Sequence, residues 1–439
     1  MPDIYEIVNS TQLNSDLEDV ADAIRAKSQG QDPLLFPSEF ISEIGSILTG
    51  ASITGQTDVT VKAMETITQN DTLWISKTKQ GIPIISPYLP GGANRCAYNS
   101  AGTRFAVAHN GSPYITIYDT TTTPYFTKLN NPSSLPAGNA FGCAWSPDGT
   151  RLAVSHNTSP FLSIYDTTTS PYTKLSGLTS ITGSGRGCAY SPDGAYLAVA
   201  HSTSPYITIY DTSTWPYTKI ANPSTLPTNN ALDCAWSPDG TRLAVSLNSS
   251  PYIAVYDTTS IPFTKLSDPN VKPSGASRAC AWNSTGTRLA VAHSSTPYIT
   301  IYDTTSTPYT KLTDPTDKPT ATGSGCAWNS DGTMLAVVYE TPGGFIVYNT
   351  TTSPYSTISG FNPLPQGTTN GACKFSPDDK RLNACCGSAP YLLTFNVSTT
   401  AEAYKATNSI INYYGGCYGY AKSSIASGYT GDAAILFEP

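Results

Sequence analysis

The stretch Cys143-Ala-Trp-Ser-Pro-Asp-Gly-Thr-Arg-Leu-Ala-Val-Ser155 decides the fold, together with Phe161-Leu-Ser-Ile-Tyr-Asp166 and Pro171-Tyr-Thr-Lys-Leu175. Ser-Pro-Asp-Gly favours a tight turn, because Pro fixes φ and Gly accepts a positive φ. The segments that flank such turns are apolar or alternate between apolar and polar residues, which is typical of strands. The unit therefore predicts four short strands, which we call a, b, c and d in chain order.

This unit recurs along the chain. Cys followed by Ala and an aromatic residue occurs at Cys96, Cys143, Cys188, Cys234, Cys280 and Cys326, with degenerate copies at Cys373 and Cys417. The successive intervals are 47, 45, 46, 46, 46, 47 and 44 residues. Four strands in roughly 40–50 residues, repeated many times, are the signature of a β-propeller.

The motifs also resemble those of a known family. Ser146-Pro-Asp-Gly149 and Ile164-Tyr-Asp166 stand where WD-repeat and bacterial YVTN-type propellers carry Ser-Pro-Asp-Gly and Ile-Trp-Asp. The resemblance covers about residues 82–439. It implies an all-β propeller of four-stranded blades, and it implies nothing about function, since one fold serves many functions.

The ends of the repeat set the number of blades. The unit that begins at Cys417 has segments for strands a, b and c and then stops, whereas Ser86-Pro-Tyr-Leu89 matches the start of a strand d. An N-terminal strand that completes the last blade would close the ring and remove its free edges. We therefore expect eight blades; seven, the common number in such families, is the alternative.

Two segments precede the propeller. In residues 1–48, Leu13, Leu17, Val20 and Ile24 recur at helical spacing and predict a small helical module. Residues 49–81 contain alternating segments and predict a short β connector. The string Val20-Ala-Asp-Ala-Ile-Arg-Ala-Lys27, with residues 32–47, resembles a module of phage tail and fibre proteins. This resemblance implies that residues 1–48 anchor the chain to other virion proteins.

Charge and composition argue against a nucleic-acid partner and against a membrane-spanning segment. The formal net charge is −7, which argues against nucleic acid as the main partner. No apolar run approaches the roughly 18 residues of a membrane span. The N-terminus has no signal-peptide pattern, so we expect synthesis in the host cytoplasm. The resemblance of residues 1–48 to phage modules implies a location in the virion.

Two kinds of ionisable residue, His and Asp, recur at fixed repeat positions. His109, His156, His201 and His293 share one position, and Asp119, Asp166, Asp211, Asp257 and Asp303 share another. Repeat-equivalent residues are spread round a ring, whereas metal ligands converge on one point. We therefore expect no metal site, with a pH-sensitive or ligand-facing histidine position as the alternative. The Asp is expected to bond the Thr-rich turn that follows it, and a cation-binding ring is the alternative.

Enzyme motifs are missing from the sequence. It contains no nucleophile elbow, phosphate loop or Cys-x-x-Cys pair. Glu340 is the sole Glu between residues 66 and 400, although propeller hydrolases gather acidic residues round a metal. We expect neither an enzyme nor a cofactor.

The ten cysteines do not read as a disulfide framework. Eight of them share the strand-a position, and such positions lie too far apart for a bond that needs Cα atoms within roughly 7 Å. They are expected to be buried free thiols, while a pairing of Cys373 with Cys385 remains open.

The candidate binding face combines two sets of loops. In the propeller family the b–c and d–a loops emerge on one side, and here the d–a loops are the longest and most varied. The b–c loops repeat Ser/Thr-Pro-aromatic. Aromatic platforms beside neutral hydrogen-bonding groups suit sugars. The candidate ligand-binding residues are Tyr114, Phe161, Tyr206, Tyr252, Tyr298 and Tyr391. The alternative is that each ring packs between blades.

These observations predict a phage virion appendage whose propeller binds a host-surface polymer, most plausibly a glycan, as an adhesin or receptor-binding fibre. Contacts would be multivalent, and we expect a homo-oligomer. One alternative is a capsid decoration or tail-assembly protein without a receptor. Another is an intracellular propeller scaffold.

Overall fold

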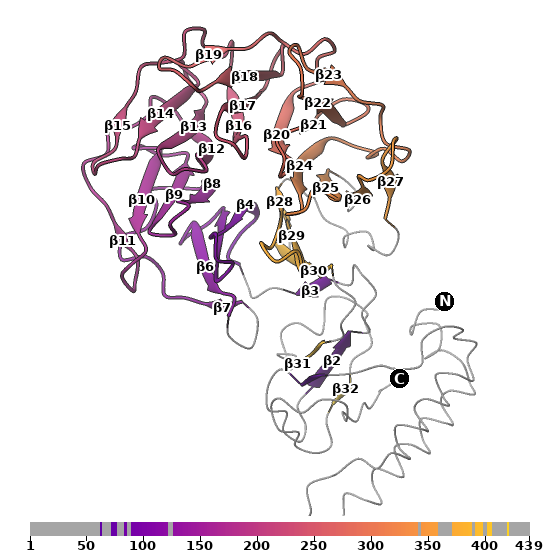
Figure 1. Ribbon diagram of the computed structural model, residues 1–439. Helices are drawn as coiled ribbons and strands as arrows, with labels where there is room; N and C mark the ends of the chain where they lie inside the picture. Colours follow the sequence, from indigo (N-terminus) through magenta and orange to yellow (C-terminus); the bar gives the residue numbers. More distant parts are fainter. Residues whose placement is uncertain are drawn as a thin grey trace, which may run out of the picture. The chain divides into compact units, whose positions relative to one another are not determined.

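The computed structural model describes residues 62–63, 72–76, 83–85, 89–121, 126–340, 344–358, 371–388, 391–397, 402–405 and 419–420. The chain divides into two compact units, Pro83–Val397 and a second unit formed by Met1–Ile82 with Ser398–Pro439. The sequence prediction assigned residues 82–439 to the propeller. The unit Pro83–Val397 contains seven four-stranded sheets arranged as a ring, so the all-β propeller is confirmed (Figure 1).

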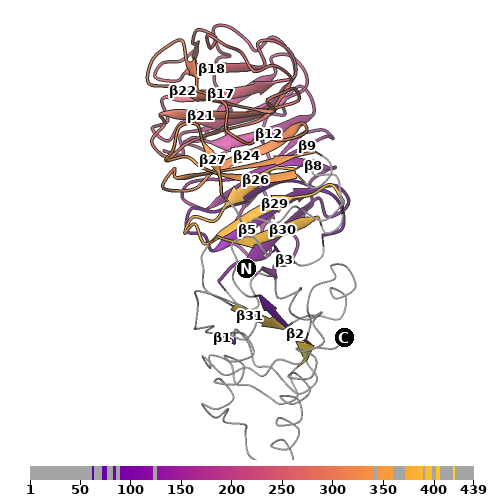
Figure 2. The same cartoon turned by 90° about the vertical axis from the view of Figure 1, so that its right-hand side faces the viewer.

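In six of the seven blades the four strands pair in chain order. The first consists of β4 (Ala93–Tyr98), β5 (Arg104–His109), β6 (Ile115–Asp119) and β7 (Thr127–Lys128). The second to sixth blades consist of β8 (Ala140–Trp145), β9 (Arg151–His156), β10 (Leu162–Asp166) and β11 (Thr173–Lys174); β12 (Gly185–Tyr190), β13 (Tyr196–His201), β14 (Ile207–Asp211) and β15 (Thr218–Lys219); β16 (Ala231–Trp236), β17 (Arg242–Leu247), β18 (Ile253–Asp257) and β19 (Thr264–Lys265); β20 (Ser277–Trp282), β21 (Arg288–His293), β22 (Ile299–Asp303) and β23 (Thr310–Lys311); and β24 (Gly323–Trp328), β25 (Met334–Tyr339), β26 (Gly344–Asn349) and β27 (Ser356–Thr357). Figure 2 shows the ring from its side, where blades on opposite sides of the ring overlap in the view.

The seventh blade joins the two ends of the propeller unit. It contains β28 (Cys373–Phe375), β29 (Arg381–Cys385), β30 (Leu392–Asn396) and, as its outer strand, β3 (Pro83–Ile85). In the antiparallel pair β3–β30, Pro83 faces Phe395 and Ile85 faces Leu393. An N-terminal strand therefore closes the ring, as the sequence predicts, but it completes the seventh unit. The expectation of eight blades is wrong: the described residues form seven.

The reason lies in the pairing of the strands that follow the seventh blade, β31 (Glu402–Lys405) and β32 (Gly419–Tyr420). They form a separate sheet with two strands that precede the propeller, in the order β1 (Lys62–Ala63), β31, β2 (Thr72–Ser76) and β32. β31 stands in sequence where a strand d of the seventh unit is expected, yet it pairs with β1 and β2. The position beside β30 is thus taken by β3. β1 and β2 lie in the predicted connector, 49–81, whereas the predicted helical module, 1–48, lies outside the described residues.

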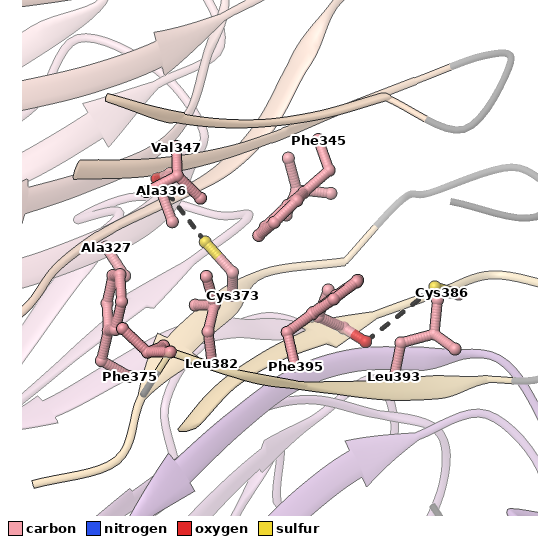
Figure 3. Close-up of a cluster of buried hydrophobic side chains, with 13 residues drawn as sticks. Ala327, Ala336, Phe345, Val347, Cys373, Phe375, Leu382, Cys386, Leu393 and Phe395 are labelled. Atoms are coloured by element: carbon pink, nitrogen blue, oxygen red, sulfur yellow. Dashed lines mark hydrogen bonds between the residues drawn. The ribbon is translucent and has the colours of Figure 1, made fainter. Parts of the chain in front are cut away.

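The core lies between neighbouring blades. Strands such as β9 bury every side chain except the first, because a blade packs against another on each face. Figure 3 shows one such cluster, in which the rings of Phe345 and Phe395, from the sixth and seventh blades, stack with centroids 4.9 Å apart. Between other blades the strand-a Trp repeats one contact: the indole N–H of Trp145 donates to the carbonyl of Ala97 at 3.1 Å. The same bond recurs at Trp236, Trp282 and Trp328.

The recurring Asp at the end of strand c serves the turn that follows. Asp166 accepts the N–H of Thr168 at 2.9 Å and also lies 3.3 Å from the Arg151 guanidinium. Equivalent backbone bonds reach Asp119, Asp211, Asp257 and Asp303. The structural interpretation of this position is therefore confirmed.

The described cysteines are buried free thiols. They are Cys96, Cys143, Cys188, Cys234, Cys280, Cys326, Cys373, Cys385 and Cys386. The open pairing of Cys373 with Cys385 is thereby excluded, and burial raises the pKa of Cys188 to about 12. Within the described ranges, no helix has the length and apolar character needed to cross a membrane.

Candidate functional site

The b–c loops share one backbone conformation. In the first blade the N–H of Tyr114 donates to the carbonyl of Gly111 at 2.8 Å, and the N–H of His109 donates to the carbonyl of Tyr114 at 2.9 Å. Within the turn from Gly111 to Tyr114, the Ser112–Pro113 peptide is cis, as in a type VI turn. The aromatic residue after the Pro takes a φ of 67–69° at Tyr114, Phe161, Tyr206, Tyr252 and Tyr298. These five residues occupy the left-handed region, which is costly for a residue with a Cβ.

All six predicted ligand-binding residues are half-buried. They stand one to a blade on six of the seven blades, so the structure arranges them round the ring and does not bring them to one point. Tyr114, Phe161, Tyr206 and Tyr391 pack against apolar core clusters. Tyr252 and Tyr298 belong to none of the apolar clusters found in the described chain. Packing thus accounts for part of the burial of Tyr114, Phe161, Tyr206 and Tyr391, and each of these residues remains partly exposed.

The d–a loops lie at the same end of the blades as the b–c loops. Thr182, in the loop before β12, donates to the carbonyl of Ser204 at 2.9 Å. Ser274, before β20, donates to the carbonyl of Thr296 at 2.6 Å. In the fourth blade the N–H of Ser249 donates to the side-chain oxygen of Asn229 at 2.8 Å. These bonds join b–c and d–a loops into one surface, which we call the loop face.

The four histidines are buried beside this face. In each, Nε2 lies 2.9 Å from the hydroxyl of a Thr or Ser seven residues further on, in strand c. Burial lowers the pKa of His156, His201 and His293 to about 4, since the charged imidazolium would lose its hydration. Neutral rings bonded to hydroxyls fit a structural role.

The histidine and its hydroxyl partner change together between blades. The pairs are His109 with Thr116, His156 with Ser163, His201 with Thr208, and His293 with Thr300. The three blades without a His carry an apolar residue at the partner position: Ala254 after Leu247, Ile346 after Tyr339, and Leu393 after Cys386. The hydroxyl is thus present only where an imidazole can satisfy it, because a buried hydroxyl without a partner is costly.

The inner strands β4, β8, β12, β16, β20, β24 and β28 surround the axis of the propeller (Figure 1). Arg95 on β4 reaches the fourth and fifth blades, where Nη1 lies 3.0 Å from the Asp233 carboxylate and Nη2 donates to the carbonyl of Arg278 at 3.1 Å. Burial is the largest single influence on Arg95 and opposes its charge, but Asp233 together with the thiols of Cys280, Cys234 and Cys188 outweighs it, so the pKa of Arg95 is raised. Gly187 leaves room for this pair, since a Cβ there would lie 2.5 Å from Asp233 Oδ1.

Sequence reasoning did not find this ion pair. Arg95 and Asp233 occupy the residue before the unit's Cys, where the other blades carry Gly or Ala. The available signal was two opposite charges at one otherwise small repeat position. Only the closed ring shows that these two blades face each other.

The described residues contain no group of three or more His, Cys, Asp or Glu side chains that could hold a metal ion. Their chemistry is that of hydrogen-bonding loops, half-exposed rings and an axial set of charges. This arrangement can bind a ligand through many weak contacts.

Comparison with known proteins places the fold. No protein-family model matches the chain, and no curated protein matches it in sequence. Hydrazine synthase of Kuenenia stuttgartiensis is similar in structure, with a TM-score of 0.57 and 16% identity, over 73% of this chain and 99% of that one. The β-propeller domain of Cps50 (Swd1) from Myceliophteria thermophila gives a TM-score of 0.57 and 13% identity over the same shares.

The chain carries a WD-repeat-like β-propeller. At these identities the similarity concerns the fold alone.

Proposed function

We propose that this protein is a phage virion appendage whose propeller binds a host-surface polymer, a glycan, through its loop face. The observation that carries the proposal is the repetition of one half-exposed aromatic residue per blade on six blades, beside loops joined by neutral hydrogen bonds. A polymer of repeating sugars offers a matching series of C–H faces and hydroxyl groups.

The backbone conformation of the rings supports this proposal. A left-handed φ at a bulky residue is usually retained only where the surroundings or the function require it. Tyr252 and Tyr298 keep this conformation without belonging to a core cluster of the described residues. A ligand-facing role gives a reason for placing aromatic residues there in place of Gly.

The virion part of the proposal comes from the resemblance of residues 20–47 to phage tail and fibre modules. In this account residues 1–48 bind other virion proteins, the chain acts without catalysis or a cofactor, and copies on one particle multiply weak contacts. A decoration or tail-assembly protein would use the same anchor without binding a host polymer.

The test is an array of purified bacterial surface polysaccharides probed with the full chain. The matched variants are the triple change Tyr206→Ala, Tyr252→Ala and Tyr298→Ala on the loop face, and Lys380→Gln at the opposite end of a blade. We expect the wild-type chain and Lys380→Gln to bind the same polysaccharides, and the triple variant to lose at least about tenfold in affinity. Absence of binding across the array, or equal binding by the triple variant, would overturn the proposal.

A further inference from the structure

Two further arginines lie on the inner strands, one residue nearer the loop face than the Arg95–Asp233 pair. Arg186 of β12 and Arg278 of β20 each precede the unit's Cys by two residues. The residues at this position differ from blade to blade although the rest of the unit is nearly constant: Asn94, Phe141, Arg186, Leu232, Arg278, Ser324 and Gly371. Variation at one position of a repeated scaffold indicates that packing does not fix its residue.

Neither arginine is neutralised by a carboxylate within the described part of the chain. The ion pairs there include Arg95 with Asp233 but none with Arg186 or Arg278. The two charges also act on each other: burial, and then the charge of Arg278, lower the pKa of Arg186. The two like charges stand at one repeat position on inner strands two blades apart, in a protein whose net charge is −7.

The Arg186 side chain is held in place but left without its full set of partners. Its guanidinium carbon lies 4.7 Å from the centroid of the Phe141 ring, and a cation over an aromatic face is fixed in orientation. Its Nε is buried and has no hydrogen-bond partner. A buried donor without an acceptor is rare in folded proteins, and each case calls for an explanation.

Arg278 is joined to the axial ion pair through its backbone. Its backbone carbonyl accepts a bond from Arg95, which fixes β20 against the axial pair, while its own side chain is exposed. Asp233 is occupied by Arg95 and by the N–H of Cys280. Among the described residues, Asp233 is therefore not available as an acceptor for the two outer guanidinium groups.

We infer that Arg186 and Arg278 form an anion-binding site at the axis of the loop face, which takes the carboxylate or phosphate group of an acidic polymer. A guanidinium presents paired N–H donors that match either group. The Phe141 ring beside Arg186 adds an apolar surface next to the charge. Acidic sugars and sugar phosphates combine these features.

This inference rests on the proposed function only where it names a polymer; the site itself depends on the two arginines. The test is calorimetric titration of the full chain, at low ionic strength, with sodium glucuronate and separately with sodium phosphate. These two probes distinguish a carboxylate from a phosphate ligand. The variants are Arg186→Gln, Arg278→Gln and, as a control that removes one exposed positive charge elsewhere, Lys380→Gln.

We expect saturable binding of one anion per chain for at least one probe. Each Arg→Gln change should weaken it about tenfold, while Lys380→Gln leaves it unchanged. Unfolding midpoints of all variants establish that they fold, and Arg186→Lys, which keeps the charge, should weaken binding less than Arg186→Gln. Absence of saturable binding of both anions, or equal loss in Lys380→Gln, overturns the anion site.

The outcomes separate this inference from the proposed function. Binding of neutral polysaccharides without binding of either anion would reject the site and leave the proposed function standing. Binding of an anion without binding of any surface polysaccharide would reject the proposed function and leave the site standing.

Discussion

Arg95 of the first blade and Asp233 of the fourth blade form an ion pair of 3.0 Å across the axis of the propeller. Their side chains are only 20% and 10% exposed. Because charges at such a depth lose most of their hydration, each side chain stabilises the charge of the other. The pair also joins blades that are not neighbours in the ring, which inter-blade packing alone does not do.

Removal of one member of the Arg95–Asp233 ion pair is expected to lower the free energy of unfolding. Arg95→Met leaves the Asp233 carboxylate buried without its counter-ion, and should lower the free energy of unfolding by about 3 kcal/mol. The measurement is equilibrium unfolding of the full chain in guanidinium chloride.

Two controls accompany Arg95→Met. The double variant Arg95→Met with Asp233→Leu should recover most of the loss, because no charge is left buried. Lys272→Met, which removes a more exposed pair with Asp268, should cost less than about 0.5 kcal/mol. Unchanged stability of Arg95→Met would show that the axial pair contributes nothing.

The covariation of histidine and hydroxyl predicts a coupling energy. His201→Leu leaves the buried hydroxyl of Thr208 without its partner, and Thr208→Ala does the same to Nε2 of His201. The double variant reproduces Leu247 and Ala254 of the fourth blade. A double-mutant cycle of unfolding free energies should therefore give a coupling of about 1 kcal/mol, and additive single effects would contradict the account.

The same histidines predict a loss of stability in mild acid. Unfolded histidine titrates near about pH 6.5, whereas the folded pKa of His156, His201 and His293 is about 4. Between these values the unfolded chain binds more protons, so the stability is complete above about pH 6.5 and is lost as the pH falls toward about 4. Denaturant midpoints measured across this range should fall, and less steeply for the His201→Leu, Thr208→Ala variant. A midpoint that rises or stays level would be inconsistent with neutral buried rings.

Two tyrosines at one repeat position should respond differently to the loss of their hydroxyl. Tyr302 donates to the carbonyl of Val271 at 2.8 Å, whereas the hydroxyl of Tyr165 is buried without a partner. Tyr302→Phe should therefore lower the free energy of unfolding by about 1 kcal/mol, and Tyr165→Phe should leave it unchanged or raise it. Chemical denaturation of the two variants is a direct comparison, and equal losses would refute it.

Two tyrosines with a left-handed φ, Tyr252 and Tyr206, are expected to differ in their effect on stability when changed to Gly. Tyr252, with a φ of 67°, belongs to no core cluster of the described residues, so Tyr252→Gly should raise the free energy of unfolding by up to about 1 kcal/mol. The same change should weaken polysaccharide binding. Tyr206, with the same φ, packs against a core cluster, and Tyr206→Gly should be destabilising. A destabilised Tyr252→Gly variant with full binding would assign this ring to packing.

The sequence predicted the blade because each blade depends on local signals. The Ser-Pro-Asp-Gly turn and the alternating strand c recur with the same spacing, and the turn Asp and strand-c Asp satisfy nearby backbone groups. The number of blades depends instead on one long-range choice, the pairing of β30 with β3 and of β31 with β1 and β2. No local pattern decides between these partners, since Glu402–Lys405 and Pro83–Ile85 both form strands.

The sequence also predicted only part of the candidate site. The position of the aromatic residues in the b–c loops followed from the repeat, but their left-handed backbone and their partial packing did not. The axial charges, Arg95, Asp233, Arg186 and Arg278, stand at positions that differ between units, so the residues that the units share do not predict them. They become a group only because the ring closes.

The central claim is that the loop face binds the polymer, and hydrogen exchange of the full chain tests it most directly. Amide exchange is compared with and without a polysaccharide selected on the array. We predict that protection increases in the b–c loops around Tyr206, Tyr252 and Tyr298 and in the d–a loops joined to them, with no change in the a–b turns such as Ser146–Gly149 at the opposite end. Protection confined to the a–b turns, or no change in any loop, would contradict the claim.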